Sequence, residues 1–162
     1  MQSFKIIKPI HILTPYVRYY WILEDGADVS ERTLPTGCIQ LVFHRGKRLL
    51  LVGKKESQPQ AFICGQCLNF SDVMSAGKIE MITVVFQPYA ARAILQLPLK
   101  FFYGELIAVD AIEDLELSIL SRKVIEADDH ETCIRLIEQF LIHRLYRFEG
   151  YEYNLKRISA VL

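Results

Sequence analysis

The chain has 162 residues, of which 51% are hydrophobic and 23% charged, and its 19 Lys and Arg balance 19 Asp and Glu. This length suits one domain with a core of its own, and high hydrophobicity at zero net charge excludes a disordered chain. Zero net charge also disfavours a free-standing nucleic-acid binder, because such proteins carry a basic excess that neutralises phosphates.

The segment before Pro88 predicts a meander of short strands. Runs of β-branched and aromatic residues alternate there with Gly, Pro and polar clusters, and Asp25-Gly26 has the chemistry of a turn. So many short strands in so few residues predict an antiparallel barrel or sandwich. We expect the strands at residues 17–24, 31–34, 38–44, 48–52, 61–64 and 79–87.

Beyond Pro88 the hydrophobic period lengthens to that of helices. Residues 89–96 predict a short helix that ends before Pro98, because the residue before a proline is pushed out of the α region. Asp110 and Glu113 then have the spacing of a capping box and predict the start of a second helix.

The last predicted helix spans residues 132–148, with Asp128 and Glu131 as its capping box. Its apolar stripe is wider than one packing partner requires, which favours a second partner and hence a homodimer. The predicted subunit contacts on this helix are Ile134, Ile137, Phe140, Leu141 and Leu145.

The charges divide where the hydrophobic period changes. Residues 1–60 carry nine Lys and Arg against five Asp and Glu, a net of +4, whereas residues 101–150 carry five against eleven, a net of −6. Such asymmetry either orients two subunits or marks a solvated surface without a partner, which is its more common meaning.

The cysteines are expected to be reduced. No apolar stretch is long enough to span a membrane and no secretory signal is recognisable, so the chain is predicted to be cytoplasmic, where thiols stay reduced. Cys64 and Cys67 form a CxxC, but no helical stripe follows it, so a thiol-redox sensor remains a minor alternative. Cys38 and His44 do not have the spacing of a second zinc-binding pair.

No sequence motif predicts catalysis. The four histidines are scattered without an HxH pair, and no phosphate-binding loop or nucleophile elbow is present. We therefore expect a protein that is not an enzyme and holds neither metal nor cofactor. A small barrel enzyme or isomerase is the alternative, favoured if a metal or an organised polar pocket were found.

Polar and aromatic residues within the predicted strands are the candidate ligand contacts. Tyr19 and Trp21 share one strand face, and Gln40 and His44 share a face of another. A buried amide such as Gln40 needs hydrogen-bond partners, which either the backbone or a ligand supplies. The predicted ligand-binding set is Tyr19, Trp21, Arg32, Gln40 and His44.

A family resemblance rests on residues 9–150. YVRYYWIL, ERTLPTGCIQLVFHRG, FICGQ, VVFQPYAARAILQLPL and an acidic stretch ending in LIEQFLIHRL follow one another in this order. The order resembles the N-terminal sensor domain of AraC-type bacterial transcription regulators, and the pattern R-x-LP-x-G-x-x-x-L-V-F from Arg32 to Phe43 is its most specific part. Gln40 stands where such domains often have an acidic residue, and Pro88 is followed by Tyr89-Ala90 rather than Gly-Gly-Ala.

The resemblance implies an α+β fold and a regulatory role. Residues 1–88 would form an antiparallel, cupin-like β-barrel or sandwich and residues 89–150 a helical part of the same sensor domain. Residues 151–162 would be a linker and the start of a helix-turn-helix domain, through which alone the protein would bind DNA. A small-molecule effector or a change in dimer packing would then act on DNA binding indirectly.

Overall fold

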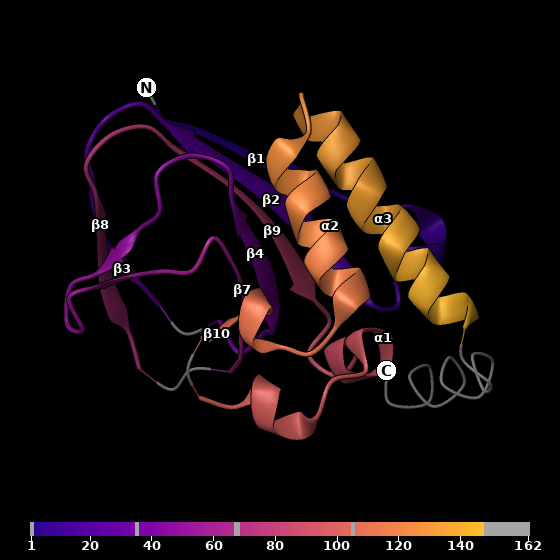
Figure 1. The fold of residues 1–162 in the computed structure, drawn as a ribbon. Coiled ribbons are helices and arrows are strands. Elements are labelled where there is room, and N and C mark those ends of the chain that lie inside the picture. Colours follow the sequence, from indigo (N-terminus) through magenta and orange to yellow (C-terminus); the bar gives the residue numbers. More distant parts are fainter. Residues whose placement is uncertain (1, 35, 67–68, 105, 148–162) are drawn as a thin grey trace.

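The computed structural model describes residues 2–34, 36–66, 69–104 and 106–147. They form three layers: a four-stranded sheet, a six-stranded sheet and a layer of helices (Figure 1). Among the described residues, no helix is both long enough and apolar enough to span a membrane.

The six-stranded sheet is antiparallel throughout and forms the middle layer. Its central strand β9 is apolar at nearly every position, because both of its faces are covered. The strand order is β1 (Ser3–Ile7), β2 (Val17–Asp25), β9 (Ile79–Phe86), β4 (Gln40–His44), β7 (Ala61–Cys64) and β10 (Ile107–Ala108).

The four-stranded sheet covers one face of the six-stranded sheet. Its order is β3 (Val29–Thr33), β8 (Ser71–Ser75), β5 (Leu50–Leu51) and β6 (Glu56–Ser57). Val29 and Val73 of this sheet lie in one buried cluster with Val42, Phe62 and Met81 of the other. The antiparallel sheets together with the helices confirm the α+β class. Within the described part of the chain the ladders form two separate sheets, so closure into a cupin-like barrel is not confirmed.

Helices cover the opposite face of the six-stranded sheet. Leu41, Phe43 and Ile82 of the sheet share the larger core with Leu117 and Ile137 of two long helices. The helical elements are η1 (His11–Leu13), α1 (Ala91–Leu95), η2 (Leu99–Phe102), η3 (Val109–Ala111), α2 (Leu115–Glu126) and α3 (His130–Tyr146).

Both long helices begin at a different aspartate from the one predicted. Asp114, not Asp110, caps α2 by accepting a hydrogen bond from the amide of Leu117 at 3.0 Å. Asp129, not Asp128, caps α3 by accepting from the amide of Thr132 at 2.7 Å. The first buried apolar residue follows the capping aspartate by three positions in α2, at Leu117, and by four in α3, at Cys133, so packing selects between nearby acidic residues.

Candidate functional site

The predicted ligand residues of the six-stranded sheet lie on one surface. We call the side of this sheet that is turned toward the four-stranded sheet the inter-sheet face. Side chains alternate along a strand, so the packing of Trp21, Val42 and Met81 against the other sheet places every second residue here. Tyr19, Trp21, Gln40 and His44 all fall on this face.

The strand register brings these residues close together. Val85 of β9 lies between Tyr19 of β2 and Gln40 of β4, since it pairs with both. One step along β9 on the same face, Thr83 pairs with Trp21 on one side and Val42 on the other. The inter-sheet face therefore carries a row of polar and aromatic side chains across its three central strands.

Two fully buried side chains of the inter-sheet face hold polar atoms without a hydrogen-bond partner among the described residues. They are the Thr83 hydroxyl and the Nδ1 atom of His44. His44 Nε2 lies 2.9 Å from Gln58 Oε1, an acceptor, so this nitrogen carries the ring proton and Nδ1 presents a bare lone pair. Native proteins leave few such atoms unsatisfied, and each one calls for a bound water or ligand group.

Burial fixes the charge state of His44. Desolvation is the main influence and lowers the pKa of its imidazole, while the hydrogen bond to Gln58 opposes this and the charge of Arg48 adds to it. The ring is therefore neutral at neutral pH. A group bound beside it would be a hydrogen-bond donor rather than an anion.

Gln40 and Arg32 have protein partners already. The Gln40 amide nitrogen donates to the Thr36 side chain, Oγ1, at 3.1 Å, so its amide is held within its own segment by a side chain rather than by the backbone. Arg32 lies on the outer face of the four-stranded sheet, because Val29 of the same strand faces inward and the two differ in parity. There Arg32 forms a two-pronged ion pair with Asp72 and stacks on Phe70, so the structure does not bring it together with the other four predicted ligand residues.

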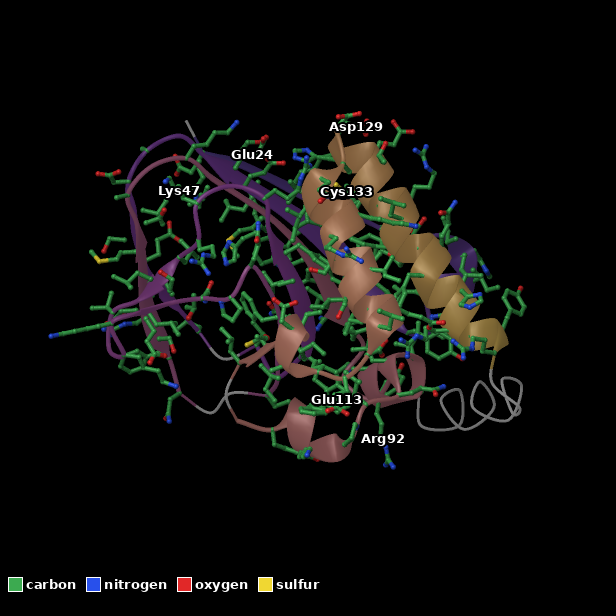
Figure 2. All side chains as sticks on the ribbon, viewed as in Figure 1. Glu24, Lys47, Arg92, Glu113, Asp129 and Cys133 are labelled. Carbon is green, nitrogen blue, oxygen red and sulfur yellow. The ribbon has the colours of Figure 1, made fainter. Side chains whose placement is uncertain are left out.

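A second polar cluster joins the sheet to α3. Glu24 and Glu80 are directly opposite on β2 and β9, and His130 at the start of α3 places Nε2 3.0 Å from Glu80 Oε1 and 3.8 Å from Glu24 Oε1. These three residues offer metal-ligand atoms within 4.8 Å of one another. However, Arg45 Nη1 lies 2.9 Å from the same Glu80 oxygen, and the amino end of α3 is itself electropositive. Arg45 and the helix end therefore supply the positive charge that the two carboxylates need, without a metal. Figure 2 shows Glu24 at the same end of the molecule as Asp129, which caps α3.

A third cluster ties the end of α3 to α1 and α2. Arg144 Nη2 lies 2.6 Å from both carboxylate oxygens of Asp114, the α2 cap, while Nη1 donates to the Leu95 carbonyl at the end of α1 at 3.2 Å. Its Nε lies 3.1 Å from Glu116. One buried guanidinium thus holds the ends of three helices together.

A family model described as a domain of unknown function, DUF6597, matches residues 5–108. The chain belongs to this family. The match spans both sheets except the first two residues of β1 and ends before α2 and α3, so the DUF6597 region contains Tyr19, Trp21, Gln40 and His44 of the inter-sheet face. No curated protein matches the chain.

Beyond the DUF6597 region, most of the predicted dimer contacts are core residues. Ile134, Ile137, Leu141 and Leu145 of α3 are buried against the sheet and helices of their own chain, and Phe140 is half-buried. The wide stripe is explained by two partners within the chain, since α3 packs against α2 on one side and the sheet on another. These four side chains are thus not available to a second subunit.

The predicted redox pair is only partly within the described residues. Cys64 is half-buried at the end of β7, and Cys67 lies outside the described residues. Cys38 and Cys133 are buried, and burial, the largest influence, raises the pKa of the Cys133 thiol. Both lack the exposure of a reactive thiol, although Arg18 Nη1 donates to Cys38 Sγ at 3.7 Å.

Sequence reasoning missed Thr83 and Gln58. A signal existed for Thr83, which is the one hydroxyl residue in the otherwise apolar run ITVVF and shares its parity with Met81. For Gln58 there was none, because it lies in a polar loop and its partner His44 is 14 residues away.

Proposed function

We propose that this chain is the effector-sensing and dimerisation region of a bacterial AraC-type transcription regulator that is not an enzyme and binds DNA only through a helix-turn-helix region outside these residues. The observation that carries the proposal is the place of the R-x-LP-x-G-x-x-x-L-V-F segment. It leads from β3 of one sheet to β4 of the other, and β4 is the strand that presents Gln40 and His44 on the inter-sheet face.

The unpartnered buried atoms support an effector at this face. A buried polar atom without a partner costs about 1–3 kcal/mol, so a ligand that satisfies Thr83 and His44 would recover this energy on binding. Because His44 is neutral and presents a lone pair, we infer an uncharged effector with a hydroxyl or amide donor. Trp21 and Tyr19 would contribute apolar contact at its edge.

The layered fold suggests how an effector would act at a distance. β4 and β9 contact the four-stranded sheet with one face and the helices with the other, so a shift of these strands reaches α2 and α3. An effector changes an equilibrium only if it binds two states unequally. The proposed output is a change in how α3 presents the DNA-binding region that would follow it.

The test uses the complete protein encoded by the reading frame. We expect two helix-turn-helix repeats after residue 162, and we expect fluorescence anisotropy to show DNA binding that weakens steeply with salt. The 162-residue chain alone, with zero net charge, serves as the negative control. A reading frame without such repeats, or a complete protein that does not bind DNA, would overturn the proposal.

Two measurements separate the remaining alternatives. Sedimentation of the complete protein at tens of micromolar is expected to show a homodimer, and a monomer there would contradict the dimerisation role. Metal analysis of the purified protein tests the enzyme alternative, because stoichiometric metal would favour a small barrel enzyme over a regulator.

A further inference from the structure

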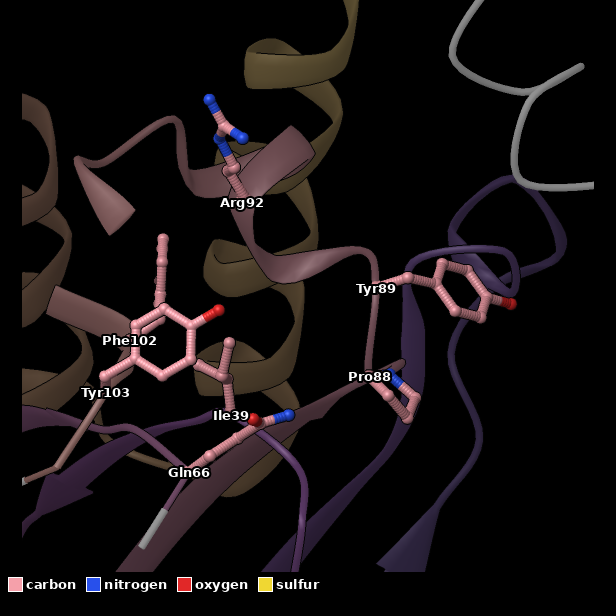
Figure 3. A pocket seen from close by; sticks show the side chains of 7 residues that line it. All are labelled: Ile39, Gln66, Pro88, Tyr89, Arg92, Phe102 and Tyr103. Carbon is pink, nitrogen blue, oxygen red and sulfur yellow. The ribbon is translucent and has the colours of Figure 1, made fainter. Parts of the chain in front are cut away.

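A pocket outside the inter-sheet face lies at the opposite side of the six-stranded sheet, where α1 approaches η2. Its volume is about 190 Å³, and its lining comes from four separate segments of the chain, whose side chains are drawn in Figure 3. It is lined by Ile39, Gln66, Pro88, Tyr89, Arg92, Phe102 and Tyr103.

The floor and the rim of this pocket differ in chemistry. Ile39 and Phe102 are buried and give it an apolar floor. At the mouth, Tyr103 is 64% exposed and so is open to a ligand that enters from solvent. The volume equals about six water molecules, which suits a ligand with a single ring.

The polar groups of the rim favour an anion. Arg92 is exposed on α1, and among the described residues its guanidinium has neither an ion pair nor a side-chain hydrogen bond. In Figure 3 it extends from the α1 wall at the edge of the pocket, on the side facing away from Gln66. A long arginine side chain reaches a bound anion by rotation. Among the described residues, no carboxylate lines the pocket to compete with that anion for Arg92.

One wall of the pocket is rigid. Gln66 N donates to the Phe102 carbonyl at 3.0 Å, and Gly104 N donates to the Gln66 carbonyl at 3.4 Å. The two chain segments of this contact pass so closely that a Cβ added at Gly65 would lie 2.7 Å from the Phe102 carbonyl oxygen.

The other wall, α1, leads to the helix-end cluster. This helix has five residues, and its last carbonyl, that of Leu95, accepts the hydrogen bond from Arg144. A ligand that moved α1 toward the rigid wall would therefore strain the hydrogen bond between the Leu95 carbonyl and Arg144. Arg144 also holds α2 and α3 together, so these helices would be affected.

We propose that this pocket binds a small organic carboxylate with a flat apolar body, its carboxylate paired with Arg92 and its ring between Phe102 and Tyr103. Binding by itself does not depend on the regulator proposal. Its consequence does, because transmission through Leu95 and Arg144 to α3 would make this a second effector site, distinct in charge preference from the inter-sheet face.

The experiment is an amide-resolved NMR titration of the 162-residue chain with phenylacetate. Phenylacetamide, which has the same shape without charge, and acetate, which has the charge without the ring, are the matched probes. We expect saturable shifts at Gln66, Arg92 and Tyr103 for phenylacetate, with at least tenfold weaker binding of both other probes.

Two variants assign the site. Arg92→Gln should weaken phenylacetate binding about tenfold or more, and Tyr103→Ala should weaken it severalfold, because each removes one wall contact from an exposed position. Arg122→Gln, at an exposed arginine of α2, is the control and should leave binding unchanged. Absence of saturable shifts, equal binding of phenylacetamide, or an unaffected Arg92→Gln variant would each overturn the site. None of these outcomes bears on DNA binding by the complete protein, so the two proposals fail separately.

Discussion

Replacement of Arg144 by methionine tests the helix-end cluster. Methionine keeps much of the length and the apolar contact of the arginine stem with Phe140, over whose ring the guanidinium lies at 4.9 Å. It removes both bonds to Asp114 and the bond to the Leu95 carbonyl. The Asp114 carboxylate is then left buried beside its own helix with only backbone donors.

The expected loss in the free energy of unfolding follows from the burial of the Arg144–Asp114 ion pair. The side chains of Arg144 and Asp114 are only 10% and 13% exposed, so this is a buried pair rather than a surface one. Breaking a buried pair by removing one partner costs about 3–5 kcal/mol, because the remaining charge stays desolvated. For a domain of this size that corresponds to a fall in Tm of about 6–20 °C.

Urea unfolding at pH 7 measures this loss. Helix content is followed by circular dichroism, and the single tryptophan, Trp21, reports on the sheets. The matched control is Arg147→Met at the residue that follows α3, whose ion pair with Glu116 is exposed and should contribute less than about 1 kcal/mol. A loss below about 1 kcal/mol for Arg144→Met, or equal losses in the two variants, would refute the reasoning.

The pH dependence gives an independent check. Burial acts to raise the pKa of Asp114, but the hydrogen bonds from Arg144 and the α2 backbone outweigh it and hold the pKa below its ordinary value. The pair therefore stabilises the native protein above the unfolded pKa of about 3.9, and this contribution is lost as the pH falls through the folded value. The difference in the free energy of unfolding between the wild type and Arg144→Met should accordingly narrow as the pH is lowered toward 3.

Three further outcomes are expected. Thr83→Val should raise the free energy of unfolding by up to about 1 kcal/mol, since it removes a buried hydroxyl without a partner, and a clear loss in urea unfolding would show that the hydroxyl is satisfied. Burial holds the folded pKa of His44 below its unfolded value of about 6.5, so the free energy of unfolding should decline as the pH falls below 6.5. His44→Gln should flatten that decline, and an unchanged pH profile in this variant would contradict the role of His44. Gly65→Ala should cost about 1–3 kcal/mol because its Cβ meets the Phe102 backbone, while Gly53→Ala, with nothing within 4 Å, should cost little, and equal melting temperatures would contradict the close approach.

Sequence patterns located several elements closely. Ala61–Cys64 was predicted with the observed bounds, and β2 and β9 within one residue, because apolar runs between turn residues leave little freedom. The strands Ser3–Ile7 and Ser71–Ser75 were missed. Ser3–Ile7 lies at the edge of its sheet and is largely exposed, and Ser71–Ser75 has only two apolar residues, so neither has a strong hydrophobic signal.

The candidate site was only partly predictable. Period-two alternation assigned Tyr19 and Trp21 to one face of their strand and Gln40 and His44 to one face of theirs, and the structure joins these into a single surface. The alternation pattern did not find Gln58, because its hydrogen bond to His44 depends on a loop that returns to that residue.

The sequence by itself determined which side chains share a face, because the backbone period of a strand or helix is local. It did not determine which face is inside. Arg32 lies outside because the opposite face of β3 packs on the six-stranded sheet, and Ile137 and Leu141 lie in the core because α3 packs against α2 and the sheet. Only tertiary packing decides these, since a periodic stripe is the same whether its partner is the same chain, a second subunit or a ligand.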